Sequence, residues 1–136
     1  MRSDQPRVFS DARLGDTLAV PGTWIVRQPD STTRVFLGPE GSDAHFARIS
    51  IQNIVPTLAG SEHQAAVATL QDLKAMLTYQ ASDIRDLVER PFVYDKGGRR
   101  IEGRQLLSEF TRERSTYRQW TIVVPRLDAG LVHVWT

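Results

Sequence analysis

The carboxy-terminal run, residues 103–136, constrains the fold most, because apolar and polar residues alternate along it in three successive segments. In the first segment Leu106, Ser108 and Phe110 fall on one side of an extended chain. Short turns separate the segments, so consecutive strands can pair with one another. The run therefore predicts a three-stranded antiparallel meander, over Gly103–Thr111, Arg118–Val124 and Leu131–Trp135.

The same alternation predicts which side chains of the meander face the core. Trp120, Ile122 and Val124 fall on one side of the second segment, and we expect them to be buried with the large apolar residues of the first. The expected outward residues are Glu109, Thr111, Arg118, Thr121 and Val123.

Shorter strands precede the meander. Residues 1–8 are polar and predict a flexible leader, and residues 9–136 are assigned to a single domain, as their number allows. The period of two recurs with turn signals between the segments, including a turn at Gln28–Thr32 and a loop at 38–43. The predicted strands are Leu14–Val20, one that starts at Trp24 and Val26, Thr33–Leu37 and Phe46–Asn53.

A single strong helix signal follows Pro56. Ser61 and Gln64 have the spacing of a capping box, and apolar residues then recur at intervals of three and four. The pattern predicts a helix from Glu62 to about Thr78 that lies on the sheet. Its apolar stripe consists of Ala66, Leu70, Leu73 and Leu77.

Two structures fit the segment Ser82–Lys96. Ile84 and Leu87 suit a helical turn, whereas alternation from Val88 suits an edge strand interrupted by Pro91, and we favour the strand. Gly97-Gly98 then predicts a hairpin turn. The chain is thus expected to have an α+β fold, with an antiparallel sheet of about six or seven strands and one long helix packed on it.

Charge and composition exclude several classes of function. The formal net charge of +1 provides no overall attraction for nucleic acid, although the part from Arg85 to Arg126 holds ten basic and six acidic residues, a net charge of +4. The signs alternate there, which favours a solvated sheet face over a nucleic-acid groove. Cysteine is absent, no apolar run reaches the length of a membrane span, and no signal peptide is recognisable.

Catalytic and metal-binding motifs are not found in the sequence. The three histidines, His45, His63 and His133, lack metal-ligand spacing, so no metal or cofactor is expected. Asp83, Asp86 and Glu89 would share one face of a helix, but flanking arginines favour a solvated face. The tryptophans Trp24, Trp120 and Trp135 are expected in the core or at a sheet edge.

The order of these elements resembles the PsbP-like superfamily. The resemblance is carried by Val20–Trp24, by the helix between Ser61 and Thr78, by a glycine opening the strand Gly103–Thr111, and by the closing strand to Thr136. This family includes PsbP, the Ran-binding factor Mog and bacterial envelope proteins of the DcrB type. The resemblance implies an α/β/α sandwich, with Ser82–Arg90 as the candidate for a second helical layer, and binding of proteins without catalysis.

Three functions are therefore compared. The first is a non-catalytic protein-interaction domain of a bacterial envelope or secretion-related protein, extracytoplasmic if a signal or anchor has been trimmed from the chain and cytoplasmic otherwise. The second is a cytoplasmic adaptor or chaperone-like homodimer, and the third a small hydrolase or ligand-binding enzyme with a cleft near His133. The candidate interaction surface consists of Glu109, Arg112, Arg114, Tyr117, Arg118 and Thr121.

Overall fold

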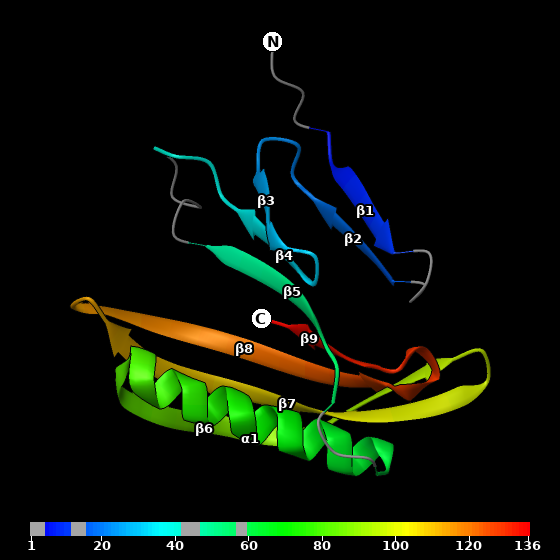
Figure 1. Cartoon of the computed structure of the whole chain (residues 1–136). Helices are drawn as coiled ribbons and strands as arrows, with labels where there is room; N and C mark the ends of the chain where they lie inside the picture. The colour runs from blue at the N-terminus through cyan, green and yellow to red at the C-terminus, as the bar shows by residue number, and fades with distance from the viewer. Residues whose placement is uncertain (1–4, 12–15, 42–46, 57–59) are drawn as a thin grey trace. The chain divides into compact units, whose positions relative to one another are not determined.

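A computed structural model describes residues 5–11, 16–41, 47–56 and 60–136 of the chain (Figure 1). It divides into two compact units, Met1–Gln52 and Asn53–Thr136, within the stretch that the sequence assigns to one domain. All strand pairings within the units are antiparallel, and one long helix accompanies them. The predicted α+β fold is confirmed.

The first unit contains two sets of strands. β1 (Arg7–Asp11) and β2 (Asp16–Val20) form a two-stranded sheet, and β3 (Ile25–Asp30), β4 (Thr33–Leu37) and β5 (Arg48–Ile54) pair in the order β3-β4-β5. The strand from Thr33 to Leu37 has the predicted bounds. Of the loop predicted at 38–43, residues 42 and 43 lie outside the described residues.

Two sequence predictions for this unit differ from the structure in detail. The first strand begins at Arg7, inside the segment expected to be a leader, and its Phe9 packs edge-on against the buried Phe36 with the ring centroids 4.9 Å apart. The turn expected over Gln28–Thr32 is shorter, because the carboxylate of Asp30 accepts hydrogen bonds from both the backbone N–H and the hydroxyl of Thr32, at 2.8 and 2.7 Å.

The second unit contains the helix α1 (Glu62–Gln80), which begins at the predicted residue and ends two residues beyond the predicted end at about Thr78. Ser61 is its N-cap, and the capping box is complete: the Gln64 N–H donates to the Ser61 hydroxyl at 3.2 Å, while the Ser61 N–H donates to the Gln64 side chain at 3.0 Å. The helix ends at Ala81, which is already extended. Of the predicted stripe, Ala66, Leu70 and Leu77 are buried and Leu73 packs against the core.

Four strands follow the helix and form a continuous meander (Figure 1). β6 (Ser82–Lys96), β7 (Arg99–Arg112), β8 (Ser115–Arg126) and β9 (Leu131–Trp135) lie in the order β9-β8-β7-β6. Ser82–Lys96 is therefore a strand, as favoured. These four strands and the three strands β3, β4 and β5 make seven, which agrees with the predicted six or seven. The two turns that join β6 to β7 and β7 to β8 use positive φ, at Gly97 and Gly98 and at Glu113 and Arg114.

The core of the second unit lies between α1 and the meander. The helix contacts β7, β8 and β9, and apolar side chains from all four elements form one cluster. A short 3₁₀ turn, η2 (Leu127–Ala129), joins β8 to β9 and places Leu127 at the border of this cluster. The buried members of the cluster are Ala65, Ala66, Leu70, Leu106, Val123, Val132 and Val134.

Two expectations about the layers of this unit are wrong. Leu106, Ser108 and Phe110 are buried as predicted, but Leu106 pairs with Thr121, so Thr121 and Val123 share the helix-covered face and are 3% and 0% exposed. Trp120, expected in the core, is 55% exposed. Within residues 60–136 no second α-helix is seen, because Ser82–Arg90, the candidate for another helical layer, belongs to β6.

Candidate functional site

The face of β6, β7 and β8 that lies opposite α1 carries three consecutive rows of side chains. The strand register defines each row, because residues directly opposite one another in antiparallel strands project from the same face. Rows are about 7 Å apart, two residues along a strand. We call this surface the groove face, and its rows are Arg85–Glu109–Arg118, Val88–Leu107–Trp120 and Arg90–Gln105–Ile122.

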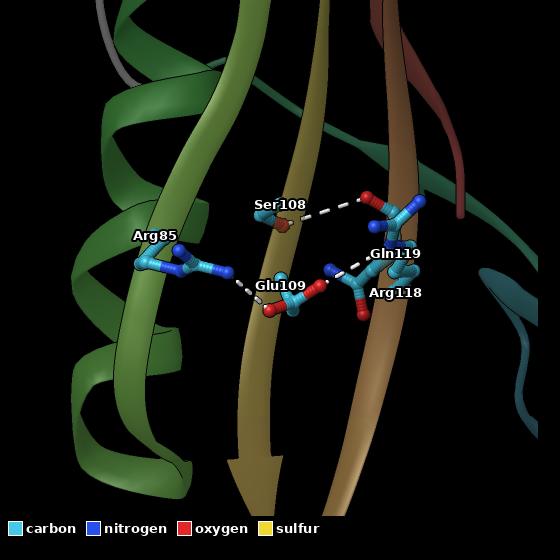
Figure 2. A network of polar contacts seen from close by, with 5 residues as sticks. All are labelled: Arg85, Ser108, Glu109, Arg118 and Gln119. Atoms are coloured by element: carbon cyan, nitrogen blue, oxygen red, sulfur yellow. Dashed lines mark hydrogen bonds and ion pairs between the residues drawn. The ribbon is translucent and has the colours of Figure 1, made fainter.

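The first row is an ion-pair network centred on Glu109 (Figure 2). Arg85 from β6 and Arg118 from β8 donate to different carboxylate oxygens of Glu109, at 2.6 and 3.2 Å. The hydrogen bond from Arg85, followed by the one from Arg118, lowers the pKa of Glu109 below its ordinary value of 4.5. Both arginine side chains remain mostly in solvent, 68% and 69% exposed, whereas that of Glu109 is 19% exposed.

The second row forms the floor and wall of an open apolar groove of about 240 Å³, which Arg90 and Gln105 also line. Val88 is 43% exposed and Trp120 55% exposed. The indole N–H of Trp120 donates to the Gln105 side chain at 3.2 Å, and the Gln105 amide donates to the Pro91 carbonyl at 3.0 Å. These bonds hold the indole in place while its apolar surface stays accessible.

A β-bulge in β6 places Val88 in this row. Asp86 pairs with Ser108 and Val88 with Leu107, so Leu87 is an extra residue in β6. Because of this extra residue, Arg85 and Val88, three apart in sequence, point to the same face.

The bulge has the same consequence on the helix-covered face, where it brings Asp86 and Glu89, also three apart in sequence, together. Lys74 of α1 lies 3.3 Å from Asp86 and 2.6 Å from Glu89, and Arg104 lies 3.6 Å from Glu89. The bond between Lys74 and Glu89 raises the pKa of Lys74 and lowers that of Glu89. These acidic residues remain exposed, as the sequence predicts, and they also tie the helix to β6.

The six residues of the sequence-predicted interaction surface do not lie together. Only Glu109 and Arg118 belong to the groove face. Arg112 and Tyr117 project from the helix side around Phe110, whose ring stacks on Tyr117 at 5.8 Å and lies 5.3 Å from the Arg112 guanidinium. Arg114 is in the β7–β8 turn, and Thr121 is buried under α1.

The residues that sequence analysis missed are Arg85, Val88, Arg90, Leu107 and Trp120. The signal that could have found them is the hairpin register. A two-residue turn at Glu113-Arg114 fixes Arg112 opposite Ser115 and therefore Leu107 opposite Trp120. Counting back from that turn shows that Trp120 lies on the opposite face from Leu106.

The structure does not bring His133 and the carboxylates of β6 together, as the hydrolase hypothesis would require. His133 is 3% exposed, its Nδ1 lies 2.6 Å from Asn53 Oδ1, and its ring meets Trp135 edge-on at 5.4 Å. Two strands, β8 and β7, separate β9 from the acidic residues of β6. His45 lies outside the described residues, and the described part of the chain holds no group of three or more residues suited to a metal ion.

A second depression belongs to the first unit. It has a volume of about 690 Å³ and is lined by residues of 5–7, 22–25 and 39–40, including Trp24 and Glu40. Arg7 donates to the Trp24 carbonyl across it.

Comparison with known proteins finds no protein-family model that matches the chain, and no curated protein that matches it. In the described residues, no helix has the length and apolar character needed to span a membrane.

Proposed function

We propose that the chain is a non-catalytic protein-interaction domain whose binding surface is the groove face. The observation that carries the proposal is the exposure of Trp120 beside the apolar side chains of Val88 and Leu107. Tryptophan and arginine are enriched among the residues that contribute most to protein–protein binding. Here one tryptophan is fixed by a hydrogen bond and flanked by arginines, so little side-chain freedom is lost when a partner covers it.

Five titratable groups of the described residues have a pKa shifted toward the charged form, in each case mainly by a hydrogen-bonding partner: Asp30, Lys74, Glu89, Glu109 and Asp128. A general acid or base that works near neutral pH needs the opposite, a carboxyl pKa that is raised or a lysine pKa that is lowered. These shifts are those of structural ion pairs and turns.

The resemblance to the PsbP-like superfamily also favours protein binding. It rests on the order of elements and on Val20–Trp24, and it favours a bacterial envelope or secretion-related protein. The proposal itself depends only on the groove face.

The proposal is tested by photo-crosslinking in the source cell. A photoreactive residue at Val88 is expected to give a discrete adduct with one protein. The same residue at Tyr79, which is 92% exposed on the helix, serves as the matched control. Absence of an adduct from Val88, or equal adducts from both positions, would contradict the proposal.

A further inference from the structure

We infer that the groove face binds an extended protein segment in which an apolar side chain is flanked by carboxylates. This inference rests on the proposed function and names the chemistry of the partner. It follows from the order of the three rows. The apolar row lies between a row with an arginine at each end and a row with Arg90 at one end.

The first row binds one carboxylate and has the capacity for another. Arg85 and Arg118 share Glu109, so the row has two positive charges and one negative charge. A guanidinium group has five N–H donors arranged in a planar fork, and each arginine here uses a bond to a single oxygen of Glu109. About two thirds of each arginine side chain is in solvent, so its remaining N–H groups can donate to both oxygens of a carboxylate from a partner.

The third row supplies positive charge on the other side of the groove. Arg90 is exposed and lines the groove together with Gln105, while Ile122 continues the apolar surface. Across the three rows there are three arginines and one glutamate, a net charge of +2. A partner that covers this surface must compensate this charge or pay the cost of desolvating it.

The row spacing sets the spacing of the partner's side chains. An extended segment that runs along the strands presents every second residue to the sheet, about 7 Å apart, which matches the distance between rows. An apolar residue seated in the groove between Val88 and Trp120 then places the residues two positions before and after it over the first and third rows. These rows carry Arg85 and Arg118 on one side and Arg90 on the other. The expected motif is acidic-x-apolar-x-acidic.

A second copy of the chain fits this surface poorly. A twofold interface pairs a patch with itself, so two surfaces that each have a net charge of +2 would face one another. Glu109 is already engaged by Arg85 and Arg118. The charge on the groove face therefore favours an acidic partner over the homodimer considered from the sequence.

Single-stranded nucleic acid is also anionic, but the groove lacks its usual platform. Such proteins stack successive bases on several aromatic side chains. Among the described residues, Trp120 is the one aromatic side chain that lines the groove, and its row continues with the aliphatic Leu107 and Val88, while Trp135 lies beyond the groove lining, opposite Ile122 in the next row. The geometry points to a protein segment.

The experiment measures binding of the purified full chain to short synthetic peptides by fluorescence anisotropy. One set carries the acidic-x-apolar-x-acidic motif, a second replaces the acidic residues by their amides, and a third replaces the apolar residue by serine. We expect the first set to bind at least about tenfold more tightly than either control set, with affinity falling as salt is raised.

Variants of the protein assign the binding to the groove face. Arg85→Gln combined with Arg118→Gln is expected to lower affinity for the acidic peptides about tenfold or more, and Trp120→Ala to lower it for all peptides. The matched control is Arg114→Gln, in the β7–β8 turn, which should change affinity less than about twofold. Circular dichroism of each variant checks that the fold is retained.

Several results would overturn the inference. These are equal binding of acidic and amide peptides, binding of acidic peptides that lack the apolar residue, binding of single-stranded oligonucleotides more tightly than any peptide, and no peptide binding at millimolar concentration. The two failures can be distinguished: a Val88 adduct that persists in the Arg85→Gln, Arg118→Gln protein retains the proposed function and rejects the acidic segment.

Discussion

Leu106 and Leu107 are neighbours in β7, yet they belong to surfaces with different roles. Leu106 is 4% exposed and contributes to the cluster beneath α1, whereas Leu107 lines the open groove between Val88 and Trp120. The helix-covered face is apolar at its centre, with a lysine bridge at its edge. On the groove face, Glu109 pairs with arginines from the two neighbouring strands, and the indole of Trp120 stays accessible. The difference shows that one strand can stabilise a fold with one set of alternate residues and present a surface with the other.

The largest effect is expected from the two leucines. Leu106→Ala should reduce the free energy of unfolding by about 2–5 kcal/mol, because it leaves a cavity in the core, whereas Leu107→Ala should cost less than about 1 kcal/mol. Urea unfolding of both variants measures the two values. Equal costs would mean that the two faces do not differ as described.

The next effect concerns the close contact of two strands. A Cβ atom at Gly103 would overlap the backbone oxygen of Val123, which cannot move without shifting β8. Gly103→Ala is therefore expected to destabilise the second unit by about 1–3 kcal/mol, as overpacking does. Thermal unfolding provides the measurement, with Gln105→Ala on the same face of β7 as the control. A stability unchanged by Gly103→Ala would show that the strands can separate at this point.

A smaller effect is expected at the start of the helix that covers one face. Ser61→Ala removes the hydroxyl that accepts from the Gln64 N–H, and should cost about 1 kcal/mol. Ser115→Ala, at the exposed start of β8, is the matched control. Circular dichroism during urea unfolding would compare them, and equal midpoints would contradict a stabilising role for the capping box.

The smallest effect is the pH dependence of the groove face. The pKa of Glu109 is lower in the folded chain than its ordinary value of 4.5, so its ion pairs stabilise the fold above that pH and stop doing so as the pH falls through the folded pKa. Glu109→Gln should therefore reduce stability at neutral pH, and the difference from the unchanged protein should vanish in acid. Melting curves between neutral pH and about pH 3 measure this, with Glu113→Gln as control. A difference that persists in acid would exclude the ion pairs as its cause.

The sequence predicted the elements better than their faces. The capping box at Ser61, the spacing of Ala66, Leu70 and Leu77, and Gly97-Gly98 all act locally, and each element that they predicted is confirmed. Trp120 was assigned to the core because a period of two identifies two faces without saying which one the helix covers. The bulge at Leu87 has no signal in the alternation, so the pairing of Asp86 and Glu89 with Lys74 could not be predicted.

By itself, the sequence determined that this chain has one long helix, an antiparallel meander in residues 103–135, and an α+β fold, because caps, turns and periodicities depend on residues close in the chain. Tertiary structure decided that Thr121 and Val123, and not Trp120, lie beneath α1. It also decided that Glu109 lies between two arginines from neighbouring strands. The side of a sheet on which a helix packs is set by contacts between residues far apart in sequence. These contacts turned the meander into a core on one face and a candidate binding surface on the other.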